Sequence, residues 1–408
     1  MDTNILRSIL GIFVLLGIAY LASSDRKNIN WRTIIGALVL QISLGAFVLY
    51  IPAGKDILLS VANGVSGVIG YANDGISFIF GEQIGEKSLG FMFAFHVLPV
   101  IVFFSALIAV LYYIGVMELV IKFIGGGLQK LLKTSQAESM SATANIFVGQ
   151  TEAPLVIKPF LPKMTRSELF AVMVGGLASV AGSVVAGYAG IGIDLKYLIA
   201  ASFMAAPGGL LMAKMLVPET EQPNDSLDDM KSDAKEAVNV IDAAATGASN
   251  GMMLALNVGA MLLAFVALLA MVNGLLGGFG ELFGLQNLSL QLILGYIFQP
   301  VAYIIGIPWH EANMAGSFLG QKIVINEFVA YLDFITVADQ LSARTQAIIT
   351  FALCGFANLS SVAILLGGMG NMAPSRRPDI AKLGMKAVLA GAMANLMSAT
   401  IAGIFITF

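Results

Sequence analysis

A short polar segment within apolar sequence constrains this chain more than any other feature. Residues 145–154 hold an amide, a hydroxyl and a carboxylate in a row, at Gln150, Thr151 and Glu152, while the flanking sequence is apolar on both sides. An ionisable side chain is unfavourable in hydrocarbon, so a carboxylate at membrane depth marks a candidate functional site. The segment therefore predicts a polar site inside a membrane protein.

The local pattern around these residues is that of one helix ending and another beginning. Residues 139–148 are expected to be helical, and Gly149 is expected to end that helix. Thr151 is a plausible N-cap for a second helix with Pro154 in its first turn. Irregular backbone at membrane depth occurs where it is buried in protein or lines a cavity. We therefore predict a re-entrant hairpin over residues 135–163, with a binding site at its tip.

The composition supports an all-α polytopic membrane protein. Apolar residues make up 58% of the chain and charged residues only 12%, roughly half the charged fraction of a soluble domain. The single cysteine, Cys354, excludes an internal disulfide, and no zinc-binding spacing is present. No basic run suggests a nucleic-acid partner.

Hydropathy predicts eight transmembrane helices, at residues 5–22, 33–51, 88–114, 168–191, 195–216, 243–273, 345–368 and 381–406. Residues 53–86 suit an interfacial helix followed by a loop, 117–133 an interfacial helix, and 288–305 an interfacial or re-entrant segment. The polar residues 217–242 form a loop. Placing Arg26, Lys27 and Arg32 in the cytoplasm puts this loop inside and both termini outside.

Two halves of the sequence resemble each other. Residues 312–339 form a second hairpin candidate, in which Glu327 corresponds to Glu152. Each hairpin is followed by an arginine and then, 10 or 11 residues later, by the glycine of a Gly-X-Ala-Ser/Asn sequence inside an apolar span. The predicted orientations of the halves are opposite, as in the inverted repeats of secondary transporters.

The repeats divide the chain into six segments. Residues 1–115 hold the N-terminal spans and an interfacial helix, residues 116–216 the first repeat, and residues 217–242 the polar loop. Residues 243–286 hold the long sixth span, residues 287–370 the second repeat, and residues 371–408 a loop and the last span.

The repeats would bring together polar side chains from both hairpin tips and both interrupted spans: Gln150, Thr151, Glu152, Ser179, Ser183, Glu327, Asn358, Ser360 and Ser361. Carboxylates accept hydrogen bonds from hydroxyls or a ring N–H, whereas amides both donate and accept. The set therefore suits a neutral molecule with several hydroxyls and an amide-like ring. Phe356 would either stack on that ring or simply pack.

A cation site is also indicated. Asn145 lies one turn before Gly149, where the last carbonyls of the first hairpin helix are unpaired and carry negative partial charge. Ser179 offers a hydroxyl, and an unwound span there would offer carbonyls. Neutral oxygen ligands fit a monovalent ion such as Na⁺. The alternative is that Asn145 only caps its own helix.

The sequence resembles the concentrative nucleoside transporter family over essentially its whole length. The resemblance is carried by Gly149-Gln150-Thr151-Glu152, Asn326-Glu327-Phe328-Val329-Ala330-Tyr331, Gly355-Phe356-Ala357-Asn358 and Met372-Ala373-Pro374-Ser375-Arg376. It implies eight transmembrane helices, two opposed re-entrant hairpins and a homotrimer of independently working protomers. It also implies that the repeats at 116–216 and 287–370 form a moving transport domain, while residues 1–115, with the third span included, and the long sixth span at 243–286 form the scaffold. Such a protein imports nucleosides of the uridine, cytidine and adenosine class across the cytoplasmic membrane by alternating access, driven by a sodium gradient.

The resemblance also implies roles for individual residues. Base-binding residues would fall on Gln150, Thr151, Glu152 and Val184. Ribose-binding residues would fall on Glu327, Asn358 and Ser361, with Phe356 beside them. Sodium ligands would fall on Asn145 and Ser179 by side chain, and on Val148, Ser179 and Val180 by carbonyl. Proton-coupled members often lack the asparagine, so Asn145 favours sodium.

Three alternatives remain open from the residues alone. One is a proton-coupled nucleoside permease, with a glutamate as the proton carrier. A second is a membrane-embedded enzyme, which is disfavoured because no nucleophile–base pair or His–Glu zinc motif is visible. The third is a passive channel, although inverted repeats favour alternating access. No cofactor other than the coupling Na⁺ is expected.

Overall fold

The structure, a computed structural model, describes residues 3–85, 90–223, 237–285 and 288–406. Within these ranges the regular secondary structure is entirely helical, as predicted for an all-α protein. Residues 224–236 of the predicted polar loop lie outside the described part, as do residues 86–89 at the predicted start of the third span.

Seven of the predicted spans are helical segments long and apolar enough to cross a bilayer. They are α1 (Thr3–Ala22), α2 (Trp31–Leu49), α6 (Phe93–His96) with α7 (Leu98–Tyr113), α10 (Arg166–Ala178) with α11 (Gly182–Gly190), α12 (Leu195–Leu216), α13 (Val240–Leu282) and α19 (Arg377–Phe405). The predicted span at 345–368 is divided into two shorter helices, α17 (Ala343–Leu353) and α18 (Ser361–Met372). Its interruption by small polar residues was predicted, and so was that of the fourth span between α10 and α11.

The predicted interfacial segments are also helical. Where one helix and a loop were expected, the chain forms α3 (Pro52–Gly70), α4 (Ala72–Phe80) and α5 (Glu82–Gly85). The amphipathic α8 (Val116–Leu132) buries Met117 and Ile121 on one face and exposes Leu119 and Phe123 on the other. Helix α14 (Leu290–Ile304) bends by 116° into α15 (Trp309–Val324), and the two pack along each other.

The first hairpin begins with α9 (Gln136–Ala144), whose first turn is closed by a capping box between Ser135 and Glu138. Glu138 also forms a buried ion pair with Lys214 of α12. The expected helix over 139–148 is wrong at its C-terminal end, because α9 ends at Ala144 and turns lead on to Gly149.

The second arm of this hairpin differs from the prediction. It consists of 3₁₀ turns, η2 (Ala153–Ile157) and η3 (Leu161–Lys163), in place of an α-helix. The N-cap position of η2 is Glu152, so the assignment of Thr151 as N-cap is wrong. Pro159 and Pro162 explain the difference, because each removes a backbone N–H that a continuing α-helix would use, whereas Pro154 lies in the first turn, where that N–H has no helical partner.

The second predicted hairpin is a helix–break–helix unit of α15 and α16 (Glu327–Val337). Asn326 caps α16, since its Oδ1 accepts a hydrogen bond of 2.9 Å from the N–H of Val329. Glu327 therefore occupies the first position of this helix, at the turn between the two arms.

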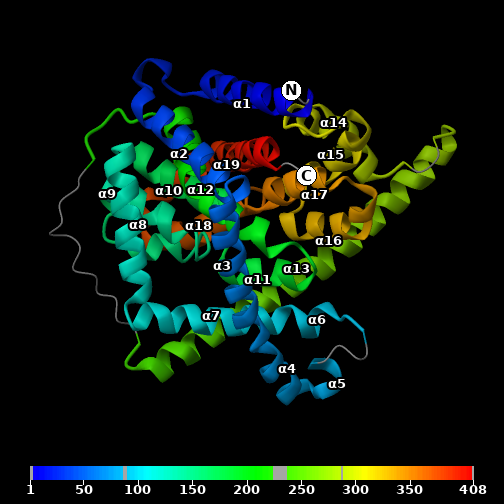
Figure 1. The fold of residues 1–408 in the computed structure, drawn as a ribbon, viewed down its shortest axis with the longest axis horizontal. Helices are drawn as coiled ribbons and strands as arrows, with labels where there is room; N and C mark the ends of the chain where they lie inside the picture. The colour runs from blue at the N-terminus through cyan, green and yellow to red at the C-terminus, as the bar shows by residue number, and fades with distance from the viewer. Residues whose placement is uncertain (1–2, 86–89, 224–236, 286–287, 407–408) are drawn as a thin grey trace.

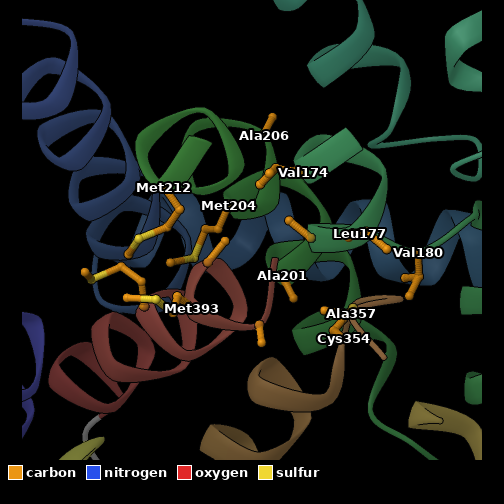
Figure 2. Packing of buried hydrophobic residues seen from close by; sticks show 14 of the residues in the cluster. Val174, Leu177, Val180, Ala201, Met204, Ala206, Met212, Cys354, Ala357 and Met393 are labelled. Atoms are coloured by element: carbon orange, nitrogen blue, oxygen red, sulfur yellow. The ribbon is translucent and has the colours of Figure 1, made fainter. Parts of the chain in front are cut away.

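Helix α19 runs through the middle of the molecule and contacts α1, α2, α10, α12, α17 and α18 (Figure 1). Figure 2 shows the buried side chains between these elements, with Met204 and Met212 of α12 near Met393 of α19. Both interrupted spans, α10–α11 and α17–α18, are thus packed against one continuous helix.

Helix α13 packs along α7 through small residues. A Cβ added at Gly251 would lie 2.7 Å from the Cβ of Ser105 and 2.9 Å from the Cα of Val102. A Cβ added at Gly247 would lie 2.5 Å from the Cβ of Ala109 and 2.8 Å from the carbonyl oxygen of Ser105. This Gly-x-x-x-Gly spacing lets two helix backbones approach closely. The opposite side of α13 is largely exposed and apolar.

We expect Gly251→Ala to loosen the α7–α13 contact, because the added methyl group overlaps backbone and side-chain atoms of α7. Overpacking of this kind destabilises a protein by about 1–3 kcal/mol, which lowers the thermal unfolding midpoint in detergent. Gly274→Ala is the matched control, since a Cβ there meets nothing within 4 Å. Equal midpoints for the two variants would show that the contact does not depend on Gly251.

Candidate functional site

The helix breaks in the two interrupted spans lie next to each other. The first break follows α10 at Ser179, and the second follows α17 at Cys354. The N–H of Phe356 in the second break donates to the carbonyl of Ser179 in the first, at 3.1 Å. The interrupted spans of the two repeats therefore hydrogen-bond to each other directly, at the place where both lose helical pairing.

Asn395 of α19 joins the same two breaks from behind. Its Nδ2 donates to the carbonyls of Ala178, at 2.6 Å, and Cys354, at 2.9 Å. A Cβ at Gly355 would overlap the Asn395 side chain, so the second break needs a glycine there. One buried amide thus binds the carbonyl ends of both α10 and α17, which would otherwise lack partners.

Glu327 is buried and held at both carboxylate oxygens. The hydroxyl of Tyr188 donates to Oε1 at 3.0 Å, and Nδ2 of Asn358 donates to Oε2 at 3.1 Å. Tyr188 belongs to α11 and is fully buried. This carboxylate is fixed in orientation, and each oxygen retains a lone pair for a further donor.

Asn358 is itself oriented by its neighbours. Its Oδ1 accepts from Ser360 Oγ at 2.7 Å, from the N–H of Ser361 at 3.0 Å and from Ser361 Oγ at 3.0 Å. Gln150 of the first hairpin lies close by, with Nε2 3.5 Å from Ser361 Oγ. The structure therefore brings Gln150, Glu327, Asn358, Ser360 and Ser361 into one polar cluster built from both repeats.

Of the remaining predicted substrate residues, Phe356 joins this cluster through its carbonyl, which accepts from Ser361 Oγ at 2.5 Å. Within the described part of the chain the others make no hydrogen bond to the cluster. Glu152 is exposed, and its Oε2 folds back over Gly149. Thr151 packs against Gly368 of α18. Val184 and Ser183 are buried on α11, one turn or so before Tyr188, and Phe356 is half-buried. Glu152 and Glu327 thus differ in environment, although the sequence placed them as equivalents.

Several buried oxygens near the end of α9 have no hydrogen-bond partner within the described part of the chain: Ser141 Oγ, Asn145 Oδ1 and Gln150 Oε1. Asn145 lies against Gly175 and Gly176 near the end of α10, and its Nδ2 donates to the carbonyl of Ser141 at 2.9 Å. Buried polar atoms are normally satisfied, so orphaned oxygens call for a missing partner. Neutral oxygens suit a hard monovalent cation such as Na⁺.

The other predicted ion ligands lie beside these oxygens in the fold. Ser179 is buried, with Oγ donating to the carbonyl of Gly175 at 2.9 Å. Val148 and Val180 are buried at the hairpin turn and the first break. Among the described residues no cluster of acids, histidines and cysteines suits a divalent metal.

Sequence reasoning did not single out three residues of this site: Ser141, Tyr188 and Asn395. Ser141 could have been found, since its spacing of four residues from Asn145 places both on one helix face. Tyr188 and Asn395 are polar residues in largely apolar helical sequence, and such residues are themselves candidate functional groups.

Most of the chain matches known protein families. Family models for the Na⁺ dependent nucleoside transporter match residues 10–83 with its N-terminus and residues 197–403 with its C-terminus, and a nucleoside recognition (Gate) model matches residues 94–194. The nucleoside permease NupC of Helicobacter pylori is 53% identical over 98% of this chain and 97% of that protein. An uncharacterized transporter of Haemophilus influenzae is 60% identical over 99% and 98%.

Solved structures agree with these sequence matches. The structure of CNTnw in an inward-facing substrate-bound state is 60% identical, covers 98% of both chains and superposes with a TM-score of 0.95. A variant of CNTnw in an outward-facing state gives a TM-score of 0.97 at 58% identity, covering 100% of this chain and 99% of that one. These relatives are transporters or permeases. This multi-pass membrane protein therefore belongs to the concentrative nucleoside transporter family.

Proposed function

We propose that this protein is a symporter that imports nucleosides across the cytoplasmic membrane, driven by a sodium gradient, through alternating access. The observation that best supports the proposal is the Glu327 cluster. A carboxylate fixed by Tyr188 and Asn358 keeps acceptor capacity for two neighbouring hydroxyls. A ribose presents its 2′- and 3′-hydroxyls in that arrangement, and bonds to an ionised acceptor are among the stronger ones.

The base would bind on the side of the first hairpin. Gln150 Oε1 has no hydrogen-bond partner in the residues that the structure describes, and Glu152 is exposed, so both can accept a ring or exocyclic N–H. Thr151, Val184 and Phe356 would complete the pocket around the base. The same site carries no Arg or Lys at the hairpin tip, which disfavours a phosphorylated substrate.

Sodium would bind between the end of α9 and the first break, with Asn145 and Ser179 as side-chain ligands and Val148, Ser179 and Val180 as carbonyl ligands. The orphaned Asn145 Oδ1 supports this position. An ion there would order the turn that carries Gln150, so that substrate binding and ion binding favour each other. By linkage, each must tighten the other by the same factor.

The two repeats, at 116–216 and 287–370, would move as the transport domain against a scaffold that includes α7 and α13. The hydrogen bond between Phe356 and Ser179 links the two breaks, and the Asn395 amide donates hydrogen bonds to both. These contacts support movement of the two breaks as one body. The exposed apolar side of α13 is available for lipid or for other protomers of a trimer.

Uptake by reconstituted protein tests the proposal. Labelled uridine should accumulate in sealed vesicles under an inward Na⁺ gradient, and accumulation should vanish when choline replaces sodium. Uptake that follows an imposed pH gradient and ignores sodium would favour the proton-coupled alternative. Equilibration without accumulation under either gradient would indicate a channel.

Glu152→Gln is expected to change the ranking of uridine, cytidine and adenosine, because Glu152 would bind the base and lies outside the Glu327 cluster. Loss of one charge-assisted bond should alter individual affinities by roughly tenfold. Competition of each nucleoside against labelled uridine measures the ranking. A uniform loss for all three would place Glu152 in coupling or folding.

A further inference from the structure

Lys322 is a cation buried deep in the second hairpin. It lies near the C-terminal end of α15 and is 2% exposed. Its Nζ donates to the carbonyl of Ala352 and to Oδ1 of Asn395, both at 2.7 Å. A buried lysine in a membrane helix is unfavourable unless something requires its charge. The proposed transport cycle described above does not use it.

The ammonium group sits at the end of a helix dipole. Ala352 is the next-to-last residue of α17, whose final carbonyls carry negative partial charge. Asn395 Oδ1 provides a second neutral oxygen. Lys322 is therefore coordinated by neutral oxygens at a helix C-terminus, which is the type of environment that also suits a small monovalent cation.

The first repeat shows the same arrangement without a lysine. There the end of hairpin helix α9 lies against the end of α10, as the end of α15 lies against the end of α17. Asn395 binds both helix ends, through Ala178 and Cys354. At the first end the structure has orphaned oxygens on Ser141 and Asn145; at the second it has the Lys322 ammonium.

We propose that the Lys322 ammonium is a tethered cation that occupies, in the second repeat, the place that a sodium ion takes in the first. For its link to transport, this inference rests on the proposed sodium coupling. It makes Lys322 a positioning residue that holds α15, α17 and α19 together. Its consequence is that only the first repeat has a place for a coupling ion, so one Na⁺ should be sufficient for nucleoside binding.

A simpler role would be neutralisation of Glu327, with which Lys322 interacts electrostatically. The hydrogen bonds argue for more than that, because Nζ donates to Ala352 and Asn395, while Glu327 is held by Tyr188 and Asn358. The two roles differ in what remains when the lysine is removed. If the neutral oxygens bind the ammonium, the empty site still attracts a cation after Glu327 is replaced by glutamine. If Lys322 is only a counter-ion, that attraction requires the Glu327 carboxylate.

Methylammonium chloride is the probe, because it supplies a free ammonium group small enough to enter the space that Lys322→Ala leaves when Cγ, Cδ, Cε and Nζ are removed. Thermal unfolding is followed in detergent, with choline chloride keeping ionic strength constant. Methylammonium should raise the midpoint of Lys322→Ala by about 2 °C or more in a saturable manner. Wild type and Lys322→Met should not respond, since their side chains still fill the space.

The double variant Lys322→Ala/Glu327→Gln separates the two roles. A methylammonium response retained without the carboxylate supports the carbonyl site, while a response present only with Glu327 overturns the inference in favour of a counter-ion. If Lys322→Ala folds poorly, it is purified throughout in methylammonium and exchanged into choline. Unfolding on exchange supports the inference, and an unchanged midpoint contradicts it.

Uridine binding provides the second measurement. Lys322→Met should bind uridine at least about tenfold more weakly, and methylammonium should restore the affinity of Lys322→Ala only. A wild-type Hill coefficient for Na⁺ near one is expected, whereas a value near two would contradict the single-ion consequence. Absence of uridine binding by wild type would sink the proposed function, while the unfolding measurements would still decide the role of Lys322.

Discussion

Glu327→Gln should weaken uridine binding by about tenfold to a hundredfold while the protein stays folded. The carboxylate is expected to accept both ribose hydroxyls, and losing a charge-assisted acceptor in a buried site costs about 1–3 kcal/mol. The glutamine amide also presents a donor where the carboxylate had only acceptors. That amide would face either Tyr188 or Asn358, both of which now donate to Glu327.

Calorimetry with uridine and 2′,3′-dideoxyuridine in detergent checks this prediction. The dideoxynucleoside lacks the hydroxyls, so its affinity should fall much less than that of uridine. Glu118→Gln makes the same chemical change on the exposed face of α8 and should leave both affinities unchanged. Equal losses for the two nucleosides in Glu327→Gln would place this residue away from the sugar.

Asn145→Leu should abolish the effect of Na⁺ on nucleoside affinity. Asn145 supplies a buried neutral oxygen with no hydrogen-bond partner among the described residues, and leucine keeps the volume apolar without offering a ligand. Leucine also favours helical backbone, so α9 should be preserved. Without the ion, the turn carrying Gln150 is no longer held in place for the base, and the variant should behave as sodium-free wild type does.

The measurement is uridine affinity at increasing NaCl, with choline chloride keeping ionic strength constant. The uridine affinity of wild type should increase with sodium, and that of Asn145→Leu should not change. Asn313→Leu, which replaces a half-buried amide on α15 outside the site, should keep the sodium response. If Asn145→Leu still binds uridine more tightly as sodium increases, the ion must bind at another site.

Hydropathy could predict most of the fold because burial in a bilayer leaves a strong signal in the sequence. The spans, the interruptions at Ser179 and Asn358, and the second hairpin around Glu327 all followed from apolar length and from polar residues within it. The 3₁₀ second arm of the first hairpin was missed because Pro154 was treated as a helix start. The further prolines at 159 and 162 carried the signal against an α-helix.

The pairing of polar groups could not be predicted in the same way. Asn395 is one amide in an apolar helix, and its acceptors at Ala178 and Cys354 lie 217 and 41 residues away in sequence. Nothing local indicates which carbonyls are unpaired until the helices are packed. The two glutamates show the same limit, because identical residues at corresponding hairpin tips differ in burial once the neighbouring elements are in place.

The length of α13 has a further consequence for how the protein sits in a bilayer. Its 43 residues rise about 65 Å at 1.5 Å per residue. Exposed apolar side chains run from Met252 to Leu282, about 45 Å, whereas the hydrocarbon layer is about 30 Å thick. Keeping that surface within the layer requires a tilt of about 50°, far steeper than the usual inclination of about 20°. Figure 1 shows α13 crossing the molecule diagonally. Because the required tilt depends on the thickness of the hydrocarbon layer, a thinner or thicker bilayer should change the slope of α13.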